Sequence, residues 1–284
     1  MITSLHLEII IIAIVAAVTC SLPGVFLVLR GVAMMSDAIS HAILLGIVLM
    51  FLIVQKLDSP LLLVGATLAG IATVLCTEKI IRSKRLKQDA AIGLIFPLFF
   101  SVGVILVSQY ARNVHLDIDM VLLGELAFAP FNRFAMAGID CGPYALWVAG
   151  MALLINSLFI RIFYKELVLT TFDATVATLA GFSPALFYYA LMLITSITAV
   201  ATFDAVGSIM VVALMITPAA TAYLLARRID QMIAISVVFA SFSAIFGYVF
   251  ASLADVSIAG SIASMTGIFF IFGLFWSKAP LKHF

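Results

Sequence analysis

Long apolar segments, separated by short polar connections, run along almost the whole chain. Nine such segments cover residues 7–29, 38–54, 60–78, 90–109, 143–163, 184–202, 205–225, 231–251 and 258–276. Most approach the roughly 20 residues that a helix needs to cross a bilayer. A transmembrane β-barrel is excluded, because its strands alternate apolar and polar residues. The pattern predicts one all-α domain over residues 1–284, a polytopic helical membrane protein with about eight or nine transmembrane helices. The short segment 38–54 leaves a full crossing and a broken helix open.

The composition supports a membrane environment. The chain is 65% hydrophobic and only 10% charged, with a mean hydropathy of +1.27. A soluble fold of this size cannot hide so much apolar surface from water. The three cysteines, Cys20, Cys76 and Cys141, form no disulfide or CxxC pattern. A net charge of +1 gives no indication of nucleic-acid binding.

The few basic residues predict the orientation of the chain. They gather in the connections after the third, fifth and seventh apolar segments and at the C-terminal end. Because cytoplasmic loops are rich in Lys and Arg, we expect all of these positions, including the C-terminus, on the cytoplasmic side. The N-terminus then lies outside, provided that residues 38–54 cross completely.

Two connections are long enough to have structure of their own. Residues 110–142 are expected to form an extracytoplasmic loop, and residues 164–183 a cytoplasmic segment. Within the second, the stretch from Phe172 to Leu179 is Ala/Thr-rich, opens with Asp173 and is followed by Gly181. These are the signals of a short helix with an N-cap and a C-terminal glycine. An ordinary interhelical loop is the alternative.

Asp37 and His41 are the clearest candidates for chemistry within an apolar segment. Ionisable residues in membrane helices are costly and therefore suggest a function. A spacing of four places both on one helix face. A carboxylate oxygen and an imidazole nitrogen suit Mn²⁺, Fe²⁺ or Zn²⁺, and a second copy of the segment would supply four ligands. Ser36 and Ser40 are candidates for orienting the pair. The alternative is a hydrogen-bonded pair that only fixes a helix end.

Other acidic and histidine residues are candidates for a gate or an entrance. Asp204 lies where the sixth apolar segment meets the seventh, and His115, Asp117 and Asp119 lie in the long outer loop. Solvated carboxylates or contacts with a docking partner are the alternatives. The phosphate-loop, HExxH and GxSxG motifs are absent from the sequence, which argues against an ATPase of that type or a hydrolase.

Small residues recur in the third apolar segment. Gly65, Ala66, Ala69 and Gly70 form two overlapping small-xxx-small pairs, which let helix backbones approach closely. We expect them to serve packing within one subunit.

Four segments resemble the permease subunits of bacterial metal-ion ABC importers, the manganese, zinc and iron uptake family. They are LRGVAMMSDAISHAILLGIV at 29–48, DAAIGLIF at 89–96, TTFDATVATLAG at 170–181, and DAVGSIMVVALMITPAATAYLLA at 204–226. The resemblance extends over nearly the whole chain and implies a type II ABC importer permease fold in the bacterial cytoplasmic (inner) membrane.

The resemblance also implies partners and site residues. A second permease subunit, two cytoplasmic ATPase subunits that bind ATP, and an extracytoplasmic metal-binding protein are expected. Asp37 and His41 match the family's intramembrane metal site, and no catalytic residue or permanent cofactor is expected. The helix that couples to the ATPase matches 171–183, with Thr171, Phe172, Asp173, Ala177 and Gly181.

The sequence departs from the family pattern at Leu45, where a proline is frequent and would break the helix. The loop HLDIDMVLLGELAFAPFNRF resembles a branch in which two different permease chains are encoded together, which favours a heterodimer over a homodimer. The resulting hypothesis is an alternating-access importer subunit for divalent metal, with manganese first and zinc or iron open. A proton-coupled secondary transporter is the alternative, and an intramembrane lipid enzyme is remote.

Overall fold

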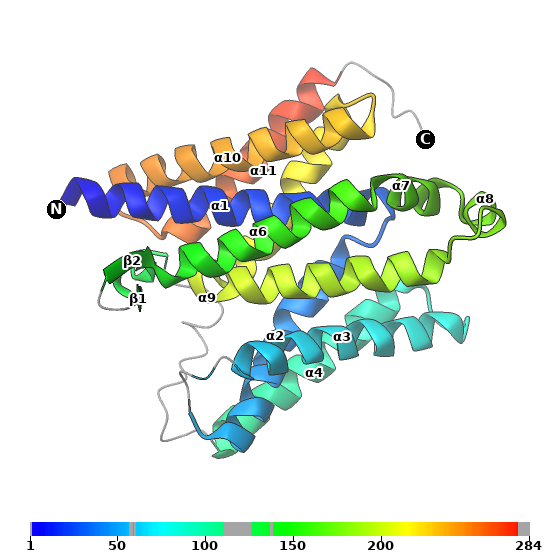
Figure 1. Cartoon of the computed structure of the whole chain (residues 1–284), viewed down its shortest axis with the longest axis horizontal. Coiled ribbons are helices and arrows are strands. Elements are labelled where there is room, and N and C mark those ends of the chain that lie inside the picture. Colours follow the sequence, from blue (N-terminus) through cyan, green and yellow to red (C-terminus); the bar gives the residue numbers. More distant parts are fainter. Residues whose placement is uncertain (1, 57–58, 60, 111–125, 137–138, 278–284) are drawn as a thin grey trace.

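The computed structural model describes residues 2–56, 59, 61–110, 126–136 and 139–277. Within this part of the chain, eight helices are long and apolar enough to cross a membrane, which confirms the helical membrane fold. The eight helices are α1 (Ile2–Leu29), α2 (Met34–Val54), α3 (Leu61–Arg82), α4 (Gln88–Tyr110), α6 (Tyr144–Ile162), α9 (Pro184–Leu225), α10 (Ile229–Ala254) and α11 (Ile258–Trp276). Helices α1, α3, α6, α9 and α10 run roughly along the long axis of the view, whereas α2 and α4 are inclined to them (Figure 1).

Helix α9 contains two crossings. It has 42 residues, which at 1.5 Å per residue would give a straight helix of about 63 Å, twice the ~30 Å hydrocarbon core. Gly207 interrupts it with φ 75° and ψ 165°. Both ends of α9 lie at the same end of the bundle, because α9 follows the short helix α8 (Ala174–Leu179) directly and its Tyr223 lines a cavity together with Phe172. The two apolar segments predicted here are therefore separate spans, and the eight helices supply nine crossings.

Helix α2 is continuous over its 21 residues and ends at Gln55, whose left-handed backbone bonds back to Phe51. The helix runs through Leu45 without a break. Of the two possibilities left open for 38–54, the structure therefore has the unbroken helix, which is long and apolar enough to cross a membrane.

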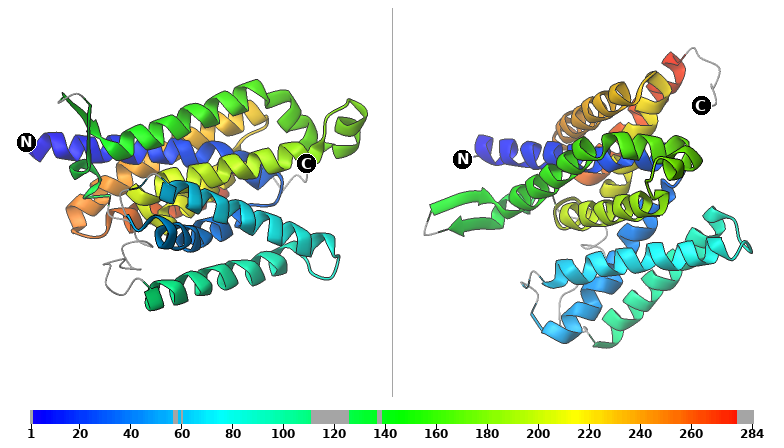
Figure 2. Two further views of the ribbon diagram at one scale, coloured as in Figure 1. Left: turned by 60° about the horizontal axis from the view of Figure 1, so that its bottom comes forward. Right: turned by 45° about the vertical axis from the view of Figure 1, so that its right-hand side comes forward.

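Helices α2, α3 and α4 form a group beside the rest of the bundle (Figure 2). Within this group α2 and α3 approach at Gly46 and Gly65: a Cβ built on Gly46 would lie 2.3 Å from the Gly65 carbonyl oxygen. A Cβ on Gly70 would lie 2.2 Å from Ser196 Oγ of α9. The small residues of α3 thus pack against helices of the same chain, as predicted.

The outer connection contains structure that the apolar pattern did not predict. The short 3₁₀ helix η1 (Ala129–Phe131) precedes an antiparallel hairpin of β1 (Arg133–Met136) and β2 (Ile139–Pro143). Arg133 Nε lies 2.6 Å from Asp140 Oδ2 across the hairpin, and Arg133 Nη1 lies 3.4 Å from Glu8 Oε2 of α1. The first pair bridges the two strands, and the second joins the hairpin to α1.

Candidate functional site

Asp37 and His41 lie side by side in the first two turns of α2. Asp37 Oδ1 and His41 Nε2 are 3.4 Å apart, and the side chains are 29% and 24% exposed. Two ligands at ~2.1 Å from one tetrahedral ion are separated by about 3.4 Å. The pair is therefore spaced so that both atoms could bind the same ion without rearrangement of the helix.

Two aromatic rings of α4 pack on His41. The ring centroids of Phe96 and Phe100 lie 5.1 and 5.6 Å from that of the imidazole. His41 Nδ1 is buried and has no hydrogen-bond partner within the described part of the chain. The second nitrogen of a metal-bound histidine normally donates to an acceptor, and the described residues supply none for His41 Nδ1. The described residues also contain no group of three or more His, Cys, Asp or Glu side chains that could hold a metal ion.

Ser36 and Ser40 are both buried. The Ser36 hydroxyl donates to the Ala33 carbonyl at 2.7 Å, and the Ser40 hydroxyl donates to the Ser36 carbonyl at 2.9 Å. Their hydroxyl protons are thus used within α2. A role in orienting Asp37 or His41 stays a prediction.

The remaining gate candidates separate into two groups. Asp204 is exposed on α9, three residues before the break at Gly207, which agrees with its expected place near a change of chain direction. His115, Asp117 and Asp119 lie outside the described residues.

The segment 164–183 forms two helices, where one was predicted. Helix α7 (Tyr164–Phe172) precedes α8. The Asp173 carboxylate caps α8 by accepting from the backbone N–H groups of Thr175 and Val176 at 3.0 and 2.8 Å. At the other end Gly181 has φ +86°, and Phe182 N–H donates to the Ala177 carbonyl, which closes the helix as a Schellman motif. Both predicted helix signals are confirmed, whereas α7 was missed because its sequence mixes polar and apolar residues.

The surface of this segment is unusually apolar for a connection. Ala177 is buried against the chain, but four large apolar side chains are exposed: Phe172, Val176, Leu179 and Phe182. Exposed apolar clusters rimmed by polar residues mark interaction sites. The segment lies at the end of the bundle opposite the β-hairpin (Figure 1).

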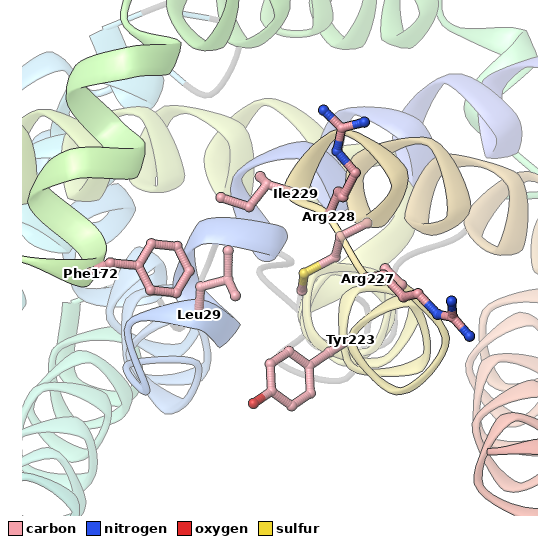
Figure 3. Close-up of a pocket in the computed structure, with 8 residues that line it drawn as sticks. Leu29, Phe172, Tyr223, Arg227, Arg228 and Ile229 are labelled. Carbon is pink, nitrogen blue, oxygen red and sulfur yellow. The ribbon is translucent and has the colours of Figure 1, made fainter. Parts of the chain in front are cut away.

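Contacts between α7 and the end of α1 were not predicted. Phe172 and Leu29 line a cavity of about 50 Å³ together with Arg227, Arg228 and neighbouring residues, and the Phe172 ring points towards Leu29 (Figure 3). Beside it, Arg30 Nε donates to Thr171 Oγ1 at 3.0 Å and Arg30 Nη2 donates to Thr170 Oγ1 at 2.8 Å. In the sequence, the only signal for Arg30 was a lone basic residue directly after an apolar segment.

Comparison with known proteins gives consistent matches along the chain. Residues 3–277 match the ABC 3 transport family. The manganese transport system membrane protein MntD of Bacillus subtilis is 42% identical, over 94% of this chain and 90% of the relative. The zinc transport system membrane protein TroD of Treponema pallidum is 47% identical, over 98% and 74% respectively. Among solved structures, PsaBC from Streptococcus pneumoniae in complex with Fab superimposes with a TM-score of 0.80 at 29% identity, covering 95% of this chain and 91% of that one.

Proposed function

The chain belongs to the ABC 3 transport family, and from this membership we propose that it forms the ion pathway of an ATP-driven importer for a divalent transition metal. It is a membrane permease subunit of a bacterial metal-ion ABC importer and not an enzyme, since ATP hydrolysis belongs to a separate subunit. Family membership removes the support for a proton-coupled secondary transporter.

The observation that carries the proposal is the Asp37–His41 pair. Its oxygen and nitrogen are 3.4 Å apart on a helix that crosses the bundle, and this ligand type suits Mn²⁺, Zn²⁺ and Fe²⁺ alike. Relatives are named for manganese, zinc and iron transport. We take manganese as the first cargo to test and the other two ions as competitors.

Two ligands from each of two permease subunits would surround one ion. Such a site can bind when the subunits approach and release when they separate, which a transport site requires because the ion must also leave. A purified permease pair carrying two copies of this segment should therefore bind one Mn²⁺ per two chains, as measured by equilibrium dialysis. One ion per chain would contradict a shared site.

The apolar surface around α8 is proposed to bind a cytoplasmic ATPase subunit. Basic residues share this end of the bundle with α8 and indicate the cytoplasmic side. They are Lys79, Arg82, Lys84, Arg85, Lys87, Arg161, Lys165, Arg227 and Arg228. On this proposal, a chain with nine crossings has its N-terminus outside and its C-terminus in the cytoplasm.

The transport cycle that follows is alternating access. A metal-binding protein delivers the ion at the end that carries the β-hairpin. ATP binding draws the ATPase subunits together and displaces α8, and the permease pair opens to admit the ion to Asp37 and His41. Hydrolysis returns the pair to the opposite state, from which the ion leaves to the cytoplasm.

The test is metal uptake by the reconstituted complex in liposomes. Asp37→Ala and His41→Ala should each abolish uptake of Mn²⁺ while co-purification with the ATPase subunit is retained. Asp255→Asn is the matched control, because this carboxylate is exposed at the end of α10 and Asn tolerates its left-handed backbone of φ 53°. Normal uptake in both site variants would overturn the assignment.

A further inference from the structure

The connection between α1 and α2 is a closed, hydrogen-bonded turn. Gly31 has φ 67°, Val32 N–H donates to the Leu27 carbonyl at 3.0 Å, and Gly31 N–H donates to the Val28 carbonyl at 3.1 Å. This is the pattern of a Schellman motif at the end of α1. Met35 N–H then donates to the Val32 carbonyl at 2.9 Å as α2 begins. A displacement of this turn is therefore passed directly to the first turns of α2, where Asp37 and His41 lie.

Arg30 fastens this turn to α7. Its guanidinium makes two hydrogen bonds, at 3.0 and 2.8 Å, to the hydroxyls of Thr171 and Thr170 in the last turn of α7. Asp173, the cap of α8, follows two residues later. The planar guanidinium holds its donors in a fixed fork, so two adjacent acceptors restrain it in position and in angle. Burial lowers the pKa of Arg30 below its ordinary value, yet an arginine stays charged at neutral pH.

The same turn is also fastened to α4. Gln88 Nε2, in the first turn of α4, donates to the Gly31 carbonyl at 3.1 Å. Further along α4, Phe96 and Phe100 pack on His41. The turn is therefore joined to α2, which carries the metal ligands, and to α4, whose rings pack on His41. Arg30 connects the same turn to the segment proposed to meet the ATPase.

From this arrangement we infer that Arg30 is a positioning residue that transmits displacement of the α7–α8 segment to the metal site on α2. The inference rests on the proposed function, since it requires an ATPase partner that moves α8. Along the chain, α8 is continuous with α6 through α7 and with α9, but not with α2. The two hydrogen bonds of Arg30 bridge this gap at the point where α7 ends.

The test measures how many metal ions enter per ATP hydrolysed, in liposomes containing the complete complex. Arg30→Met keeps the length of the side chain but removes both hydrogen bonds. We expect it to lower the ion-to-ATP ratio roughly tenfold, within the ~5–150-fold range of typical coupling between sites. Equilibrium binding of Mn²⁺ and co-purification with the ATPase subunit should stay unchanged.

Arg82→Met is the matched control. Arg82 lies at the same end of the bundle and also bonds two side chains, Glu78 at 2.9 Å and Tyr189 at 3.2 Å, but it makes no bond to α7. Its loss should leave the ion-to-ATP ratio unchanged. An equal ratio in Arg30→Met and Arg82→Met would overturn the inference.

A mutant cycle tests whether Arg30 acts through the two threonines. Thr170→Val with Thr171→Val removes the acceptor hydroxyls without changing side-chain shape. The ion-to-ATP ratio of the triple variant should be no lower than that of Arg30→Met. A loss in the triple variant equal to the product of the two separate losses would overturn the inference. If Arg30→Met does not assemble, Arg30→Lys is tested instead. Its ammonium group replaces the charge but not the paired donors of the guanidinium, so we expect an ion-to-ATP ratio between those of the unmodified chain and of full loss. A ratio equal to that of the unmodified chain in Arg30→Lys and in the double threonine variant would overturn it as well.

Failure of the inference and failure of the proposed function give different results. If Asp37→Ala abolishes uptake while Arg30→Met keeps a normal ion-to-ATP ratio, only the transmission role fails. If Asp37→Ala and His41→Ala both transport normally, the metal-site assignment itself fails.

Discussion

Adding one methyl group at Gly46 should damage the metal site without touching it. A Cβ at this position would lie 2.3 Å from the Gly65 carbonyl oxygen and 2.7 Å from the Ala66 Cα atom. Both are backbone atoms of α3, so no flexible side chain can turn away. Relief to an ordinary contact of about 3.4 Å requires that α2 and α3 separate by about 1 Å.

The displaced helix is also packed closely against α4. Gly103 of α4 packs on Leu45, and a Cβ on Gly103 would already lie 3.1 Å from the Leu45 backbone nitrogen. Overpacking of this kind costs about 1–3 kcal/mol. Because α2 carries Asp37 and His41 and α4 carries the rings on His41, the same strain should displace the metal ligands.

The assay compares Gly46→Ala with Gly267→Ala, whose new Cβ on α11 would have no neighbour within 4 Å. The thermal unfolding temperature in detergent should drop for Gly46→Ala. For Gly267→Ala it should stay unchanged or rise, since alanine is a better helix former than glycine. Uptake of Mn²⁺ by the complete importer should fall several-fold for Gly46→Ala alone. Equal stability and uptake in the two variants would refute the close approach of α2 and α3.

Further predictions concern other parts of the chain. Asp173→Ala should cost α8 about 1 kcal/mol by loss of its cap, seen as faster amide exchange in that helix, and Asp173→Asn should restore protection. Gly181→Ala forces a side chain into a backbone of φ +86° and should loosen α8 by about 1 kcal/mol; unchanged exchange would contradict the Schellman closure. Asn156→Ala removes a buried amide that bonds α1 and α9 at 2.9 and 2.8 Å and should lower the unfolding free energy by about 1–3 kcal/mol, measured in denaturant. Hydrogen bonds from Arg133 and the Gly142 backbone lower the pKa of Asp140, so their stabilisation of the hairpin is present above an ordinary Asp pKa of about 4 and is lost as pH falls below it. The protection factors of the β2 amides, which correct for the slower intrinsic exchange in acid, should therefore fall at acid pH, and Asp140→Asn should abolish that fall.

The crossings were predictable because bilayer thickness fixes the length of apolar sequence that a helix needs. This reasoning separated the two halves of α9, which the break at Gly207 confirms. It could not find the β1–β2 hairpin, whose strands are short and are bridged by an ion pair between Arg133 and Asp140. It also missed α7, where burial of Leu167 and Thr170 compensates for a mixed sequence that shows no apolar run.

The metal ligands were predictable because helical spacing alone brings Asp37 and His41 together. The contacts around them were not, because they join distant parts of the chain: Phe96 and Phe100 come from α4, and the threonine partners of Arg30 lie 140 and 141 residues away. A local pattern can place two residues on one face of a helix. It carries no information about which other helix covers that face.

The exposure of Asp37 and His41 indicates what must cover them. They are about one-quarter exposed on a helix that crosses the bundle, and turning a carboxylate towards hydrocarbon is unfavourable. Lipid is therefore a poor neighbour for this face of α2, whereas a second permease subunit presenting the same pair would replace lipid with ligands for the shared ion. Two like carboxylates at such an interface repel each other until a cation lies between them. The contact between subunits would then itself depend on the metal, which links binding of the ion to the closure that carries it across.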